Sequence, residues 1–145
     1  MRSTSTSRQA SLTWRQVEVL RTLRNHLLQI RPHYNVETVN GVLLRNSGVA
    51  AALFRSFAAR FDPSLTGDRA ALMAEAEEGV RKALEAVRSL AEDEIVRALD
   101  NLVKSALRTN AFQRPERPVF SIKVDSRKVE GMPTPRPMVE VYVHS

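Results

Sequence analysis

The chain has 145 residues, of which 22 are Lys or Arg and 16 are Asp or Glu, so its formal charge is +6. It contains no cysteine, which excludes a disulfide, a thiolate nucleophile and any zinc or iron–sulfur site built on Cys. This length suits one domain or part of one, because two independent domains would each be marginal. No apolar run approaches the roughly 18–20 residues of a membrane span, and we expect a cytoplasmic protein that does not bind a membrane.

Most of the positive charge lies at the start of the sequence. The first 31 residues carry +5 and the rest +1, because six arginines stand there against one acid, Glu18. The six are Arg2, Arg8, Arg15, Arg21, Arg24 and Arg31. Residues 1–12 are rich in Ser, Thr and Arg, a composition typical of an organellar transit peptide. A disordered, solvated N-terminus is the simpler interpretation and the one we expect.

Apolar residues at helical spacing predict two helices in the first third of the chain. The first extends from about Trp14 to Arg31 and ends before Pro32. The second follows Asn35, a residue type that caps helices, and ends at the turn signal Asn46-Ser47-Gly48. The apolar positions are Val17, Leu20, Leu23, Leu27 and Ile30 in the first helix and Val36, Val39, Leu43 and Leu44 in the second.

Three more helices are predicted up to about Asn110. The third contains three of the five phenylalanines and stops at Asp62-Pro63. After a polar loop, the fourth and fifth follow, and the acidic run 92–94 suits the start of the fifth. Their apolar positions are Leu72, Ala76, Val80, Leu84 and Val87, then Ile95, Leu99, Leu102, Val103 and Leu107. Expected ion pairs on their exposed sides are Glu77–Arg81–Glu85, Glu78–Lys82, Asp93–Arg97 and Asp100–Lys104.

The period changes from helical to alternating near Asn110, which predicts two strands. The segments from Val119 to Asp125 and from Met138 to His144 alternate apolar and polar residues. The link between them contains three prolines and is too long for a tight hairpin, so we expect a loop or an extended crossover. The predicted fold class is therefore α+β: about five helices in a bundle, then two strands with a proline-rich connection.

The sequence shows no motif for catalysis or cofactor binding. All five glycines are isolated, so no phosphate-binding or dinucleotide-binding loop is encoded. His26, His33 and His144 are too scattered for a local metal motif, and we expect each to be structural or solvated. No strand-turn-helix elbow presents a nucleophilic serine, and Ser121 and Ser145 read as strand residues. We therefore assign no catalytic, cofactor-binding or metal-binding residue.

Two features raise nucleic-acid binding as an alternative. The arginines of the first helix are able to neutralise phosphates, but at helical spacing they do not converge on one stripe. The second and third helices, joined at Asn46-Ser47-Gly48, mimic a helix-turn-helix. Their richness in apolar residues favours a hairpin within a bundle, and nucleic acid is not an expected partner.

Three stretches of the sequence stand out: WRQVEVLRTLRNHLLQI leading into LFRSFAARFDP, then Leu107-Arg108-Thr109-Asn110 followed by Phe112-Gln113, and finally SIKVD with MPTPRPMVEVYVHS. Together they resemble the large bacterial NAD-specific glutamate dehydrogenases. The likeness covers about residues 13 to 145. Two departures stand out: Ala91 where an acidic cap before the fifth helix is expected, and Ala111 where an aromatic commonly follows the Arg-Thr-Asn motif.

The resemblance implies a chain that is part of a much longer enzyme. It places residues 13–113 in a helical bundle just before the catalytic core and residues 114–145 in two strands that begin the catalytic-domain sheet. The glycine-rich substrate segment and the nucleotide-binding fold come later in that family, so the chain alone is expected to be inactive and to bind no cofactor. NAD is implied for the full-length enzyme, with the remainder of the dehydrogenase chain as partner and a homo-oligomer as the assembly.

The resemblance also suggests a local role for two residues. We expect Arg108 and Asn110 to fix the junction between helix and strand by hydrogen bonds, so that loss of Arg108 lowers the Tm of the full enzyme more than its substrate binding. The alternative from another class is a free-standing helical module that binds partners or regulates a separate dehydrogenase. A nucleic-acid binder that uses the basic first helix is the third interpretation.

Overall fold

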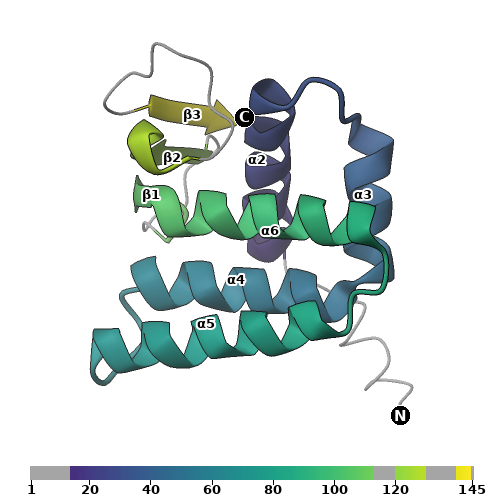
Figure 1. Ribbon diagram of the computed structural model, residues 1–145. Coiled ribbons are helices and arrows are strands. Elements are labelled where there is room, and N and C mark those ends of the chain that lie inside the picture. Colours follow the sequence, from purple (N-terminus) through teal and green to yellow (C-terminus); the bar gives the residue numbers. More distant parts are fainter. Residues whose placement is uncertain (1–13, 113–119, 130–139, 145) are drawn as a thin grey trace.

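Five α-helices precede three strands in the computed structural model, which describes residues 14–112, 120–129 and 140–144 (Figure 1). The helices are α2 (Trp14–Ile30), α3 (Val36–Arg45), α4 (Ser47–Phe61), α5 (Arg69–Glu85) and α6 (Leu90–Ser105). The strands are β1 (Ala106–Thr109), β2 (Phe120–Val124) and β3 (Glu140–His144), with a short 3₁₀-helix, η1 (Ser126–Lys128), after β2. The predicted α+β class is confirmed.

Side-chain caps start three of the helices. The Asn35 side chain accepts a hydrogen bond from the Thr38 amide at 2.7 Å, which confirms the predicted cap of α3. Asp68 caps α5 in the same way. Ser89 caps α6 through the Glu92 amide at 3.3 Å. Ala91, where an acidic cap was expected, therefore lies inside the first turn of α6, and the capping role has moved to Ser89.

The turn between α3 and α4 is shorter than the sequence predicts. Asn46 alone separates the two helices, and Ser47 and Gly48 already belong to α4. The amide and side chain of Asn46 both bond to the Val42 carbonyl, which closes α3. Two apolar positions assigned to this helix, Val36 and Leu44, are exposed, whereas Val42 is buried in their place.

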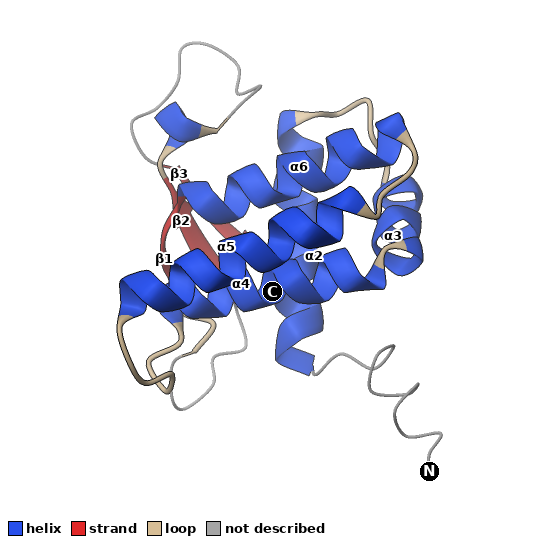
Figure 2. Cartoon of the chain, turned by 60° about the horizontal axis from the view of Figure 1, so that its bottom comes forward, coloured by secondary structure: helices blue, strands red, loops and turns tan. Residues whose placement is uncertain are grey.

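The hydrophobic core lies where α2, α4 and α6 meet. Helix α4 packs along α5 and also contacts α6, while α2 contacts α3, α4, α6 and the strands β2 and β3. Figures 1 and 2 show the strands together at one end of the helical layer, on the opposite side from α3. The largest fully buried side chains are Phe57, Leu23, Leu27, Leu53, Leu99 and Leu102. All six come from α2, α4 or α6, so the core is mainly helical.

The ion pairs on α5 and α6 follow the prediction in part. Arg97 pairs with Asp93 at 2.7 Å and Lys104 with Asp100 at 3.0 Å, as expected. Arg81 pairs with Glu78 and Glu85. Glu77, expected to pair with Arg81, instead binds Arg60 of α4 at 2.8 Å. This contact between helices arises because α4 lies along α5, a neighbour that helical spacing alone does not reveal.

The strands form an antiparallel sheet in the order β1-β2-β3. The two predicted strands correspond to β2 and β3, and their antiparallel pairing shows that a loop and not a crossover joins them. The three prolines of that link lie outside the described residues. The proposed division at residue 113 stays a prediction, as does disorder of residues 1–12, which are also outside the described part.

Strand β1 was not predicted. Leu107 was assigned to the fifth helix, but α6 ends at Ser105 and the backbone of Ala106 is already extended. Pairing of β1 with β2 supplies the backbone hydrogen bonds that continuation of the helix would have supplied. Leu107 is 43% exposed as a result, and the sheet begins within the range expected to be helical.

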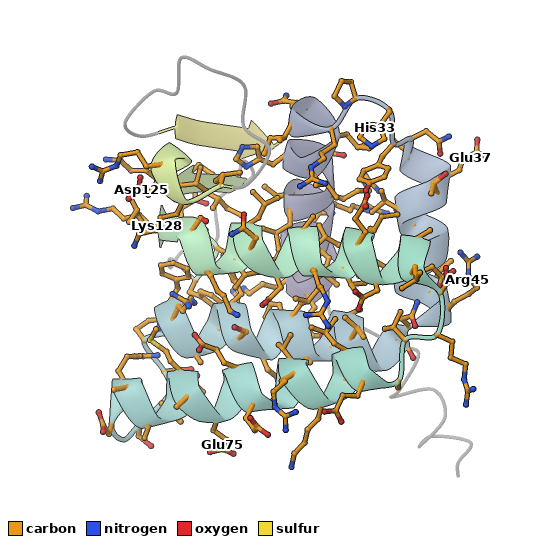
Figure 3. All side chains as sticks on the ribbon, in the orientation of Figure 1. His33, Glu37, Arg45, Glu75, Asp125 and Lys128 are labelled. Atoms are coloured by element: carbon orange, nitrogen blue, oxygen red, sulfur yellow. The ribbon has the colours of Figure 1, made fainter. Side chains whose placement is uncertain are left out.

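Side chains near the N-terminus of α6 form hydrogen bonds at both ends of α3. The Glu92 carboxylate accepts hydrogen bonds from Arg45 Nε at 2.8 Å and Asn46 Nδ2 at 3.0 Å, at the corner where Figure 3 labels Arg45. Glu94 accepts one from the Tyr34 hydroxyl, just before α3. The bonds from Asn46 and Arg45 lower the pKa of Glu92, while burial and Glu94 raise the pKa of Tyr34.

We predict that Glu92→Gln lowers the Tm at neutral pH by a few degrees, because the neutral amide loses the ion pair with Arg45. The folded pKa of Glu92 lies below its ordinary value of 4.5, so its contribution is present above that pH and disappears as the pH falls through the folded pKa. Thermal melts of both proteins across this range should therefore converge in acid. Glu75→Gln, at an exposed acid of α5, is the matched control. An equal loss of Tm there would contradict a stabilising role of the contact between Glu92 and Arg45.

Candidate functional site

The described residues contain no grouping of side chains that suits metal binding. Within residues 14–112, 120–129 and 140–144, no three His, Asp or Glu side chains lie together as a metal site requires. None of the helices in the same part is long and apolar enough to cross a membrane. The expectation that the chain has no catalytic, cofactor-binding or metal-binding residue stays a prediction.

The three histidines occupy unrelated positions. His26 is only 2% exposed on α2, within the core, as the structural interpretation expects. His33 is exposed before α3, and its ring lies 4.4 Å from that of Tyr34 (Figure 3). His144 ends β3 and pairs in register with Phe120. The three residues thus lie on α2, before α3 and at the end of β3.

Arg15, Arg21 and Arg24 of α2 contact other side chains of the fold. The Arg15 guanidinium lies over the Phe112 ring at 5.5 Å from its centroid. Arg21 pairs with Glu18 at 3.2 Å. Arg24 donates to Asn40 of α3 at 2.9 Å. Arg2 and Arg8 lie outside the described residues. Three of the six arginines near the start of the chain therefore contact other side chains of the fold.

The pair α3 and α4 does not present a recognition helix. Eight residues of α4 are buried, including Val49, Leu53 and Phe57, because the helix lies between α5 and α6. A recognition helix needs an exposed face that fits the major groove of DNA. The geometry supports the hairpin within a bundle that the apolar composition predicts.

A groove of about 540 Å³ between α4 and α5 is concave but lacks the pattern of an active site. The described residues that line it are Arg55, Ala58, Ala59, Leu65, Leu72, Glu75, Ala76, Glu78, Gly79 and Lys82. Neither His nor Ser is among these residues. Figure 3 shows Glu75 pointing outward from α5, away from the other helices. A ligand site usually combines an apolar cavity with a few convergent polar groups. Six of the ten residues that line this groove are Ala, Leu or Gly, and Glu78 already pairs with Arg81.

The junction between α6 and the sheet is the most elaborate polar site of the described chain. Helix α6 passes into β1 without a loop, since Ser105 ends the helix and Ala106 begins the strand. The Ser105 hydroxyl donates to the Asn101 carbonyl at 2.8 Å. The Ser105 carbonyl accepts the Asp125 amide at 2.9 Å, which ties the end of α6 to the end of β2. Ser105 is buried, so these bonds are shielded from water.

The Arg-Thr-Asn motif closes the other end of the pairing between β1 and β2. The Thr109 hydroxyl donates to the Ser121 carbonyl at 2.8 Å and accepts the Ala111 amide at 3.1 Å. Asn110 Oδ1 accepts the Ser121 amide at 2.9 Å. Both backbone groups of Ser121, which the sequence presented only as a strand residue, are thus satisfied by side chains of the motif.

The expected role at the junction holds for Asn110 and is wrong for Arg108. Arg108 is exposed, and its side chain forms no hydrogen bond or ion pair with the rest of the described chain. The sequence motif was informative, but the residue beside Asn110 that forms the bonds is Thr109.

Phe112 anchors this junction to the helices. Its ring lies 6.2 Å from that of Phe54 and 6.0 Å from that of Phe57, both on α4, and it packs under Arg15 of α2. Ala111, where an aromatic was expected, is buried at 3% exposure, and the aromatic side chain that contacts the helices from this segment is that of Phe112.

A second turn, after β2, completes the junction. The buried Asp125 carboxylate accepts the Arg127 amide at 3.1 Å and Arg127 Nε at 3.0 Å. The guanidinium beside it lowers the pKa of Asp125. Asn101 of α6 donates to the Lys128 carbonyl at 3.1 Å, so η1 is tied back to α6. Figure 3 shows Asp125 and Lys128 together at this end of the sheet. An Asp two residues before an Arg, directly after a strand, was the available sequence signal.

We predict that Asn110→Ala destabilises the chain by about 1–3 kcal/mol, because the Ser121 amide loses its acceptor. Urea unfolding followed by circular dichroism measures the change. Arg108→Ala is the matched control next to it and should leave the unfolding free energy unchanged or slightly higher. Equal losses in the two variants would contradict the assignment of the junction to Asn110.

We also predict that Phe112→Ala costs about 2 kcal/mol, less than the roughly 3–5 kcal/mol of a fully buried phenylalanine because Phe112 is half-buried. Phe112→Leu keeps much of the apolar contact and should cost clearly less. The same unfolding experiment compares the two variants. Wild-type stability of Phe112→Ala would show that the ring does not anchor the junction.

Comparison with known proteins connects this architecture to one family. Residues 8–63 match the family model of glutamate dehydrogenase, helical motif 3, which includes α2, α3 and α4. Residues 79–145 match the model of bacterial NAD-glutamate dehydrogenase, catalytic domain, which includes the end of α5, α6 and the three strands. The junction built by Ser105, Thr109 and Asn110 therefore lies within the part that matches the catalytic domain.

Curated relatives agree with both matches. Each of the following covers 94% of this chain: the NAD-specific glutamate dehydrogenases of Halomonas elongata, at 33% identity, and of Mycobacterium tuberculosis and Pseudomonas aeruginosa, at 32%. The chain spans about 9% of the length of each relative. The resemblance seen in the sequence is confirmed: the chain belongs to the family of large bacterial NAD-specific glutamate dehydrogenases and corresponds to their third helical motif and the beginning of their catalytic domain.

Proposed function

We propose that this chain serves as the segment of a NAD-specific glutamate dehydrogenase that joins the third helical motif to the first strands of the catalytic sheet. Its role is to hold β1, β2 and β3 in a fixed position, so that the parts of the enzyme that bind glutamate and NAD assemble on them. The observation that carries this proposal is the junction at Ser105. There a buried helix continues directly into the sheet, and the Asp125 amide bonds to its last carbonyl.

The reaction proposed for the whole enzyme is the oxidative deamination of L-glutamate. In that reaction glutamate, NAD and water give 2-oxoglutarate, ammonia and NADH. We assign the catalytic and nucleotide-binding residues to parts of the enzyme outside this chain, because its glycines are isolated and its described polar clusters satisfy one another. The chain by itself is then inactive, and its partners are the remainder of the dehydrogenase chain and further copies of it in a homo-oligomer.

Two other functions find less support. A free-standing interaction module does not account for the match of residues 79–145 to a catalytic-domain model. A nucleic-acid binder would need free arginines on α2, whereas Arg15, Arg21 and Arg24 all contact other side chains of the fold. Salt-dependent DNA binding that weakens when these three become alanine would favour the nucleic-acid binder over our proposal.

We predict that the 145-residue chain produces no NADH from glutamate and NAD, whereas an enzyme that contains it does. The test replaces the matching segment of the Halomonas elongata relative with this chain and measures glutamate-dependent NADH formation. The same replacement with the Pseudomonas aeruginosa segment is the control for grafting. Activity of the isolated chain would contradict our placement of the catalytic machinery. A folded chimera that is inactive while the control graft is active would contradict the proposed role of the segment.

A further inference from the structure

Arg108 is the residue of the sequence motif that the junction does not use, and its position across the sheet is informative. The register between β1 and β2 places Arg108 directly opposite Lys123, after an irregularity between Ala106 and Arg108. Cross-strand partners lie on the same face of a sheet. Lys123 stands between Ile122 and Val124, which are 2% and 0% exposed. Since side chains alternate along a strand, Arg108 and Lys123 lie on the face that points away from the buried core.

Two cations opposite each other destabilise a sheet unless an anion lies between or beside them. Among the described residues, neither side chain forms an ion pair. Two described acids near this pair in sequence already have partners, because Asp125 binds Arg127 and Asp100 binds Lys104. Within the described part of the chain, the outer face of the sheet thus carries an unfavourable pair of charges.

We propose that Arg108 and Lys123 form a docking site for a carboxylate-bearing segment of the rest of the dehydrogenase, which covers the outer face of the sheet. This inference rests on the proposed function. A guanidinium and an ammonium that face each other are complementary to an acidic side chain, which would turn the repulsion into two charge-assisted bonds. The chain spans about 9% of the length of its relatives, so most of the enzyme is available to supply that segment.

Charge reversal at Lys123 tests the proposal because the expected sign differs between two contexts. In the 145-residue chain, Lys123→Glu should raise the Tm by a few degrees, since the new carboxylate faces Arg108. In the Halomonas chimera, the same substitution should lower the Tm by a similar amount, because it repels the acidic segment. Arg88→Glu, at an exposed cation between α5 and α6 without an ion pair in the described structure, is the matched control. It should not change sign between the two contexts.

If charge reversal prevents the chimera from folding, a neutral substitution at Lys123 tests the same proposal. Lys123→Gln removes the repulsion without adding an acid, so it should raise the Tm of the chain and lower that of the chimera. A rise in both contexts, or no change in the chimera, overturns the docking site. An active wild-type chimera with this outcome would leave the proposed function intact and reject only the inference. Loss of activity in the wild-type chimera would reject the proposed function instead.

Discussion

The direct passage of α6 into β1 is the constraint on which the rest of the structure depends. A helix that ends in the core leaves carbonyl groups without partners, and each must be satisfied locally. Here the Ser105 carbonyl receives the Asp125 amide from the end of β2, so the end of the helix and the ladder of the sheet satisfy one another. The orientation of the sheet relative to the bundle follows from this bond, and the side chains of Thr109 and Asn110 fix the opposite end of the same strand pair.

Helix α6 acts as the central element because both of its ends hold other parts of the chain. Near its N-terminus, Glu92 and Glu94 bind the segments on either side of α3. Its last turn binds β2 and η1 through Ser105 and Asn101. Between them, apolar residues such as Leu99 and Val103 pack in the core. Displacement of α6 would therefore move α3 and the first strands together, which is the physical basis of the positioning role that we propose for this segment.

Several arginines of this protein stabilise its fold by contacts with other side chains. The excess of arginine near the N-terminus suggested a surface for phosphates, yet Arg15 stacks on Phe112 and Arg24 binds Asn40. Arg60 links α4 to α5 through Glu77, and Arg45 links α3 to α6 through Glu92. Arg108 and Lys123 differ from these cations because the register sets them against each other instead of against an acid. That difference is the reason for proposing the outer face of the sheet as a docking site for another part of the enzyme.

The sequence by itself determined the helices, two of the strands and the family. Local signals were sufficient for these: Asn35 capped α3, apolar spacing located most core residues of α2 and α6 but missed Val19 and Val96, and alternation located β2 and β3. Only the tertiary structure decided that Ala106 to Thr109 form a strand. The helical spacing of apolar residues continues to Leu107, and the extended conformation wins because β2 lies alongside to share hydrogen bonds. The same dependence on distant neighbours explains why Thr109, and not Arg108, joins Asn110 at the junction, and why Glu77 binds Arg60.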